Sequence, residues 1–137
     1  MPIIIGIETA TQTCSVAITA NEQVLALKES SGSNEHSTLL TQYIQEVIEL
    51  AGVETKNIDA IAVSIGPGSY TGLRIGLSAA KGLCYALDKP LIVVSTLKAI
   101  AHRALTTAVQ NQTAASETII IPLIDARRME AYSASYT

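Results

Sequence analysis

The first thirty residues alternate between apolar and polar positions with the two-residue period of β-strands. Residues 2–8 form an isoleucine-rich run, and residues 13–19 and 23–29 alternate small, polar and apolar side chains. The turn between the last two runs is only three residues long, at 20–22. Such short connections predict three strands in an antiparallel meander. The polar run at 30–34 predicts a loop.

From His36 the period changes to that of an amphipathic helix, which Gly52 ends. Its apolar positions recur at three- and four-residue spacing: Leu39, Leu40, Tyr43, Ile44, Val47, Ile48 and Ala51. This arc covers roughly half of the circumference, more than the ~100° that one packing contact needs. We expect the helix to pack on the sheet and on a second surface.

The rest of the domain alternates strands with helices. Apolar runs predict strands at 58–65 and 91–94, and helical spacing predicts helices at 71–87 and 96–109. The resulting order, β-β-β-α-β-α-β-α, predicts an α/β domain with a mixed five-stranded sheet and helices on both faces.

A polar loop at 111–117 closes this domain, which we place at residues 1–117. Residues 118–124 and 130–136 alternate as two further strands. We interpret residues 118–137 as the first hairpin of a truncated second domain of the same type.

The helix predicted at 71–87 is apolar on two sides. One side consists of Leu73, Gly76, Leu77, Ala80, Leu83, Cys84 and Leu87, and the opposite side of Ile75, Ala79, Gly82 and Ala86. The sheet covers one side, and the other needs the first helix, a partner chain or another part of the protein. Together with the wide arc of the first helix, this pattern indicates a protein–protein interface, with burial inside the domain as the alternative.

Composition narrows the function classes. Apolar residues make up 48% of the 137 residues and charged residues 15%, which excludes intrinsic disorder. The net charge of −3 and the absence of Trp and Phe argue against stand-alone nucleic-acid binding. Two distant cysteines exclude a disulfide framework, and the first residues lack a signal-peptide pattern. We expect a cytoplasmic protein without membrane association.

The loop GPGSYTG at 66–72 is the most informative motif, but it matches no nucleotide-binding or nucleophile-elbow pattern. Its small residues predict a tight turn that lets the following helix approach closely. A second turn, with Glu8, Thr9 and Thr11, could approach a phosphate, or its hydroxyls could satisfy the turn's own backbone groups. His36 and His102 have no partner at metal-ligand spacing, so no metal site and no catalytic residues are predicted.

Four segments resemble the TsaB family, also called YeaZ: IGIETATQTCSVAI, NEHSTLL, SIGPGSYTGLRIGLSAAKGL and PLIDARRMEAYSASY. The resemblance covers essentially the whole chain and implies the fold of actin, Hsp70 and sugar kinases, with ribonuclease H-like domains. Such proteins assist in making threonylcarbamoyladenosine on tRNA. The resemblance further implies a partner surface built from the first two helices: Leu39, Tyr43, Val47, Gly72, Ile75, Gly76, Ala79, Gly82 and Ala86.

The family's catalytic relative, TsaD, carries an H-x-x-x-H metal pair and a complete ATP site. This sequence has no H-x-x-x-H, and Glu8 stands where Asp is commoner in the first phosphate turn. Arg127 stands where active relatives have the Gly of D-x-G, which hinders backbone approach to a phosphate. We therefore expect no bound cofactor, with ATP bound by the partner subunits and weak nucleotide binding left open.

The resemblance implies a non-catalytic scaffold that binds and activates TsaD, with the ATPase TsaE joining the pair. TsaD would transfer the threonylcarbamoyl group to the adenosine that follows the anticodon in tRNAs reading codons that begin with A. The chain would contact tRNA only through the complex. Alone, the chain would form a homodimer through the first two helices. Two alternatives are a hydrolase, either peptidase or ATPase, and a homodimer whose interface regulates which partner is engaged.

Overall fold

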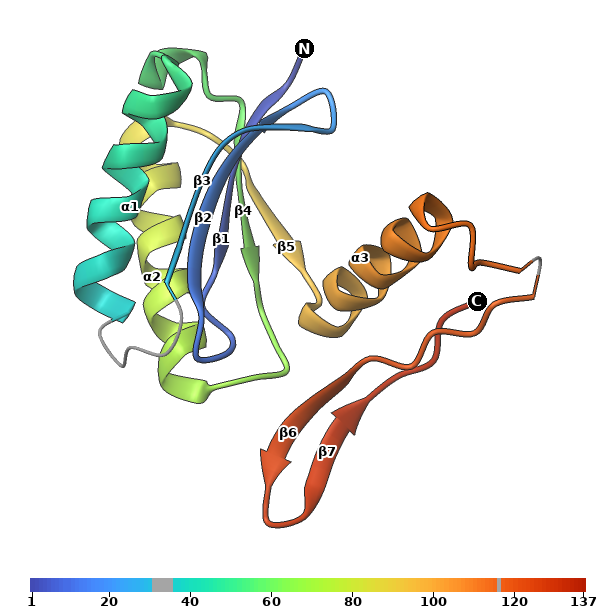
Figure 1. The fold of residues 1–137 in the computed structure, drawn as a ribbon. Helices are drawn as coiled ribbons and strands as arrows, with labels where there is room; N and C mark the ends of the chain where they lie inside the picture. The colour runs from blue at the N-terminus through green and yellow to red at the C-terminus, as the bar shows by residue number, and fades with distance from the viewer. Residues whose placement is uncertain (31–35, 116) are drawn as a thin grey trace.

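The computed structural model describes residues 1–30, 36–115 and 117–137. Its main sheet has the order β3-β2-β1-β4-β5 (Figure 1). The strands are β1 (Ile3–Glu8), β2 (Cys14–Ala20), β3 (Gln23–Ser30), β4 (Ala60–Ser64) and β5 (Leu91–Val94). β1, β2 and β3 pair antiparallel, whereas β1, β4 and β5 pair parallel. The mixed five-stranded sheet is therefore confirmed; of the predicted loop at 30–34, Ser30 ends β3 and the rest lies outside the described residues.

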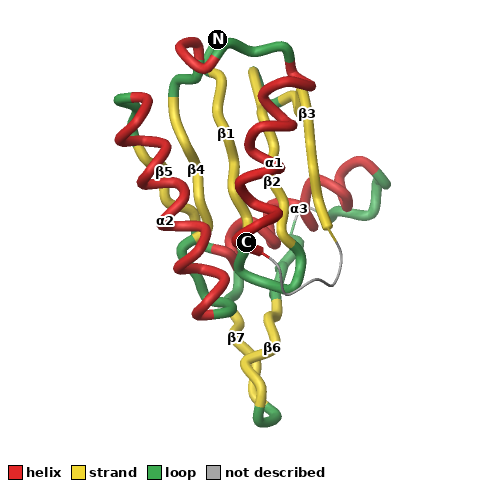
Figure 2. Tube along the Cα trace, turned by 90° about the vertical axis from the view of Figure 1, so that its left-hand side faces the viewer, coloured by secondary structure: helices red, strands yellow, loops and turns green. Residues whose placement is uncertain are grey.

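Two helices, α1 (His36–Ala51) and α2 (Tyr70–Leu87), cover one face of this sheet (Figures 1 and 2). A third, α3 (Thr96–Gln110), follows β5 and lies on the opposite side. Its first turns bury Thr96, Leu97 and Ala101, and most of its remaining length is exposed. A short 3₁₀ helix at Thr55–Asn57 precedes β4. In the part of the chain that the structure describes, no helix is long and apolar enough to cross a membrane.

The core lies between the sheet and the two helices α1 and α2. Every second strand residue points into it, as the period of two requires. These inward positions include Ile5, Ile7, Val16, Ile18, Ile61 and Val63. Leu40 and Val47 of α1 complete the core on the helix side, and both are buried. The wide apolar arc of α1 is thus divided between the sheet and the neighbouring helix.

The last residues form a hairpin of β6 (Leu123–Arg127) and β7 (Glu130–Ser133), separate from the five-stranded sheet. The strand predicted at 118–124 begins later, at Leu123, with one isolated bridge between Ile120 and Tyr136 before it. Pro122 cannot donate a backbone hydrogen bond, which accounts for the interrupted ladder. The interpretation of this hairpin as part of a second domain stays a prediction.

Candidate functional site

The turn GPGSYTG brings the start of α2 against the turn that follows β1. Ser69 caps the helix, because its hydroxyl accepts a hydrogen bond from the Gly72 amide at 3.2 Å. The Ser69 amide donates to the Ala10 carbonyl at 2.7 Å, and the Thr9 hydroxyl donates to the Gly72 carbonyl at 2.6 Å. A Cβ on Gly72 would meet the Thr9 carbonyl oxygen. The predicted close approach of the helix is confirmed.

The Glu8–Thr11 turn uses most of its polar groups within the chain. The Glu8 carboxylate accepts hydrogen bonds from the Ala10 amide at 2.7 Å and from the Ser64 hydroxyl. Thr9 is buried and bonded to α2, and the Thr11 hydroxyl accepts from the Thr13 amide at 3.4 Å. These side chains therefore hold β1, β4 and α2 together at one end of the sheet.

Replacing Glu8 by alanine is expected to lower the free energy of unfolding by about 2 kcal/mol, because the buried Ser64 hydroxyl loses its acceptor. Urea denaturation followed by circular dichroism measures this change. Glu54→Ala serves as the control, since Glu54 forms an exposed ion pair with Lys56 and its loss should leave stability nearly unchanged. Equal stability of the two variants would contradict a role of Glu8 in holding the turn.

A groove of about 500 Å³ runs between α1 and α2. Its lining residues are Ser37, Leu40, Thr41, Tyr70, Thr71, Arg74, Ile75, Ser78 and Ala79. Leu40 is buried, and Ile75 and Ala79 are half-buried, so the deepest part is apolar. Exposed hydroxyl groups surround this apolar part. Arg74 is the charged residue of the lining.

The structure separates the predicted interface residues into three groups. Ile75 and Ala79 line the groove, and Gly82 and Ala86 are exposed on the same helix. Leu39 and Tyr43 are half-buried on α1 and pack against the core. The third group, Val47, Gly72 and Gly76, is enclosed within the domain, and Gly72 and Gly76 lie against Thr9. We leave this third group out of the surface that a partner contacts.

Two exposed residues of this surface, Tyr70 and Arg74, are absent from the interface predicted from the sequence. Arg74 donates a hydrogen bond from Nη1 to the Tyr70 hydroxyl at 3.2 Å, and its guanidinium lies 5.4 Å from the ring centroid. Their four-residue spacing places them on the same side of the helix. This spacing of an aromatic and a basic residue is the sequence pattern that could have marked them as part of the surface.

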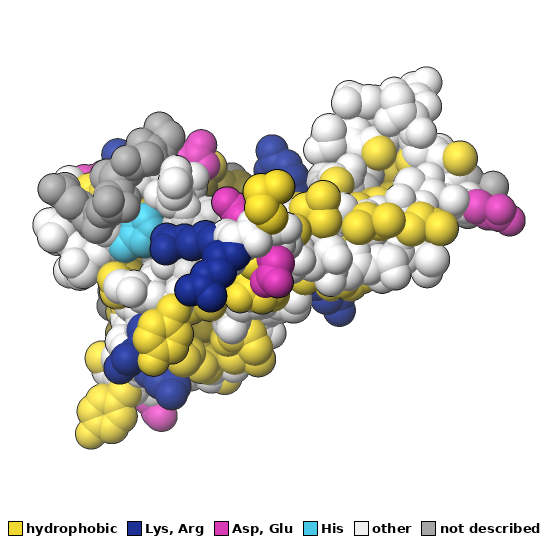
Figure 3. Space-filling model, turned by 90° about the horizontal axis from the view of Figure 1, so that it is seen from below, with side chains coloured by type: hydrophobic (Ala, Val, Ile, Leu, Met, Phe, Trp, Pro, Cys, Tyr) yellow, Lys and Arg dark blue, Asp and Glu magenta, His cyan; other side chains and the backbone are white. Residues whose placement is uncertain are grey.

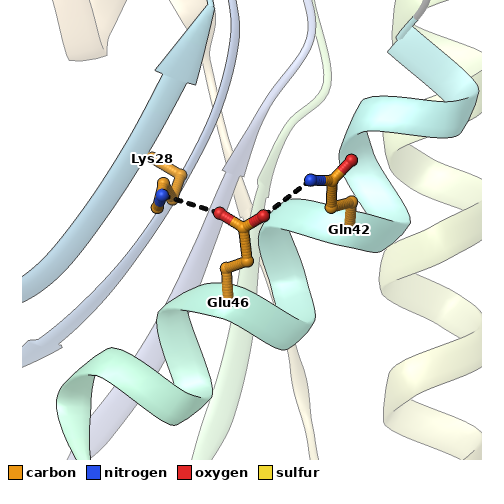
Figure 4. A network of polar contacts seen from close by, with 3 residues as sticks. All are labelled: Lys28, Gln42 and Glu46. Atoms are coloured by element: carbon orange, nitrogen blue, oxygen red, sulfur yellow. Dashed lines mark hydrogen bonds and ion pairs between the residues drawn. The ribbon is translucent and has the colours of Figure 1, made fainter.

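The Glu46 carboxylate of α1 is engaged by neighbouring side chains (Figure 4). Lys28 of β3 forms an ion pair of 2.7 Å with Glu46, and the Gln42 amide donates to the same carboxylate at 2.6 Å. The hydrogen bond from Lys28 holds the pKa of Glu46 below its usual range. One turn further on, the Gln45 amide donates to Glu49 at 3.0 Å.

The other candidate reactive side chains are spread over the fold and differ in burial. His36 lies buried at the start of α1, with Nε2 2.8 Å from the Thr11 carbonyl, and His102 is exposed on α3. Cys14 is buried, and burial raises the pKa of its thiol. Arg127 has a positive φ of 66°, and its amide donates to the Asp125 carboxylate at 2.7 Å. In residues 1–30, 36–115 and 117–137 no cluster of three or more metal-ligating side chains is present.

Comparison with known proteins gives a consistent result. A family model described as TsaD, tRNA N6-adenosine threonylcarbamoyltransferase, matches residues 23–137. The tRNA threonylcarbamoyladenosine biosynthesis protein TsaB of Escherichia coli is 37% identical over 133 residues, which cover 97% of this chain and 54% of that protein. The chain thus spans about half the length of the curated relatives it matches.

Solved structures agree with this result. YeaZ from Pseudomonas aeruginosa superposes with a TM-score of 0.84 and 32% identity, covering 99% of this chain and 60% of that one. RuvC of Thermus thermophilus has a TM-score of 0.53 at 13% identity, over 85% of this chain and 82% of that one, a likeness of fold alone. The predicted fold of the actin and Hsp70 class is confirmed.

Proposed function

Because this chain belongs to the TsaD-like family, on its TsaB (YeaZ) branch, we propose that it is a non-catalytic subunit that binds and activates TsaD. The TsaB relatives are named as tRNA threonylcarbamoyladenosine biosynthesis proteins. In this proposal TsaD performs the chemistry, and TsaE joins as the ATPase. The complex works in the cytoplasm.

The observation that carries the proposal is the groove between α1 and α2. An apolar strip with a polar rim is the common anatomy of a protein–protein interface. Ile75 and Ala79 are half-buried and line the groove, which leaves room for a side chain from a partner helix. Small residues on α2 allow a partner helix to approach closely. Two partner helices packed against α1 and α2 would form a bundle of four helices.

The charge of the chain supports a division of labour with the partner. A net charge of −3 is unsuited to holding a phosphate backbone, so tRNA contacts this chain only through the complex. TsaD binds the ATP and the metal, whereas this chain contributes a docking surface. The Glu8–Thr11 turn corresponds to the family's first phosphate turn. Its Glu8 and Thr9 side chains are hydrogen-bonded within the domain.

Alone, the chain pairs with a second copy through the same two helices. The groove is then filled by the equivalent helices of the copy, as a two-fold interface allows. TsaD competes with this homodimer for one surface.

Light scattering on a sizing column tests the proposal. The chain is run alone and then mixed with TsaD from the same organism. We expect a homodimer in the first run and a one-to-one complex with TsaD in the second. A chain whose mass is unchanged by TsaD at micromolar concentrations would contradict the proposed function.

A further inference from the structure

The Glu8–Thr11 turn is bonded to the starts of both helices that form the groove. Thr9 and Ala10 bond to the start of α2, and Thr11 bonds to the start of α1. The turn lies at the lower end of the molecule in Figure 1, the end that Figure 3 shows face on, where basic and hydrophobic side chains lie side by side. One short segment of chain therefore holds both helices at the same end.

On the α1 side the contact is a buried hydrogen bond. His36 is the first residue of α1 and is buried, and its Nε2 lies 2.8 Å from the Thr11 carbonyl oxygen. Because a carbonyl oxygen can only accept, Nε2 is the donor. The next residue, Ser37, lines the groove. The bond from His36 therefore fixes where the first turn of α1 stands.

On the α2 side the turn packs against the first two turns of the helix. The Thr9 hydroxyl donates to the Gly72 carbonyl at 2.6 Å, and a Cβ added to Gly76 would meet the same hydroxyl oxygen. Four residues from these helical turns line the groove: Tyr70, Thr71, Arg74 and Ile75. Thr9 thus touches the inner side of the helix segment whose outer side forms the groove.

The bond from Thr9 is additional to the hydrogen bonds of the helix itself. In an α-helix the carbonyl of Gly72 already accepts from the amide of Gly76, so the hydroxyl contributes to the position of α2 more than to its formation. A methyl group in place of the hydroxyl does not fit at 2.6 Å, since carbon–oxygen contacts lie at about 3.3–3.6 Å. The start of α2 would have to move outward by roughly 0.7–1 Å.

Resting on the function proposed above, we propose that the Glu8–Thr11 turn sets the separation of the two helix starts, and that Thr9 and His36 are positioning residues for TsaD binding. Both side chains are buried and act through the helix start that each one holds. A binding surface tolerates displacements of only about 0.5 Å in the elements that support it. A moved α2 therefore lowers affinity although every contacting residue is still present.

The test compares Thr9→Val with Thr9→Ser, which keeps the donor hydroxyl and loses only a methyl group. Thr9→Val is expected to weaken TsaD binding, measured by calorimetry, about tenfold, the size of changes that act from outside a contact surface. Thr9→Ser should bind within about threefold of wild type. His36→Leu should weaken binding as Thr9→Val does, and His36→Gln, which retains a donor, should restore part of the loss.

Ile58→Val is the matched control for a loss of stability alone. Ile58 is fully buried in the same core, at the end of the sheet where the Asp59 amide donates to the Ile3 carbonyl, away from the Glu8–Thr11 turn. Its substitution removes one methyl group from the core and lowers stability. It should leave TsaD binding unchanged, and thermal melts of all variants establish that they are folded.

A crystal structure of Thr9→Val measures the position of α2 without TsaD. The start of α2 should lie roughly 0.7–1 Å further from the turn than in the wild-type chain, whereas Thr9→Ser should superpose on wild type. This measurement does not depend on the proposed function.

Three outcomes would overturn the inference. Equally tight TsaD binding by a folded Thr9→Val chain would exclude the positioning role and leave the proposed function intact. An equal loss of binding in Ile58→Val would assign the effect to stability. An unmoved α2 in the crystal structure of Thr9→Val would exclude the role of Thr9 whether or not TsaD binds. If the wild-type chain does not bind TsaD, the proposed function fails, and the role of the turn in TsaD binding fails with it.

Discussion

Gly72→Ala is expected to destabilise the domain by about 3 kcal/mol, a large fraction of the stability of a small protein. A methyl group at this position meets the carbonyl oxygen of Thr9, which belongs to backbone and cannot swing aside. The start of α2 would have to move away from the β1–β2 turn. Such a movement also breaks the hydrogen bond from the Thr9 hydroxyl to the Gly72 carbonyl. Urea denaturation measures the loss.

Gly82→Ala is a control on the same helix, with an expected change in the free energy of unfolding of the opposite sign. A Cβ at Gly82 meets nothing within 4 Å, and the residue is exposed. Gly82→Ala should therefore raise the free energy of unfolding by about 0.5–1 kcal/mol through helix propensity. A stabilising effect at both positions would show that α2 does not need its close approach to Thr9.

Ala79→Arg is expected to weaken TsaD binding at least ~100-fold, or about 2.7 kcal/mol, which is the size of an interface hot spot. Ala79 lies on the apolar part of the groove, where a long cationic side chain fills the space that a partner side chain needs. Light scattering with TsaD should then give the separate masses. The same substitution should also weaken the homodimer, since the proposed function assigns both assemblies to this groove.

Ala104→Arg on α3 is the matched control, because Ala104 is exposed on a helix that lies on the other side of the sheet. It should leave the complex intact. A thermal melt of Ala79→Arg within a few degrees of wild type establishes that the domain is folded. Full TsaD binding by a folded Ala79→Arg chain would refute the groove as the interface.

Local pattern was sufficient for most elements. The helix expected at 71–87 is observed at Tyr70–Leu87, and the strand expected at 91–94 at Leu91–Val94. Both have short-range causes: periodic apolar positions inside the element, and small or proline residues at its ends. The strand predicted at 118–124 was wrong over most of its length, because β6 begins only at Leu123. The apolar pattern runs through Pro122, but proline has no backbone amide to donate to a strand ladder.

By itself, the sequence determined the order of strands and helices, the two apolar sides of α2 and the family resemblance. These depend on residue spacing along one chain. Only the tertiary structure decided that Val47, Gly72 and Gly76 face inward, whereas Tyr70 and Arg74 border a groove. It also joined Glu8 to Ser64, 56 residues apart. Such outcomes depend on how two elements pack against each other, and a helical period describes only one element at a time.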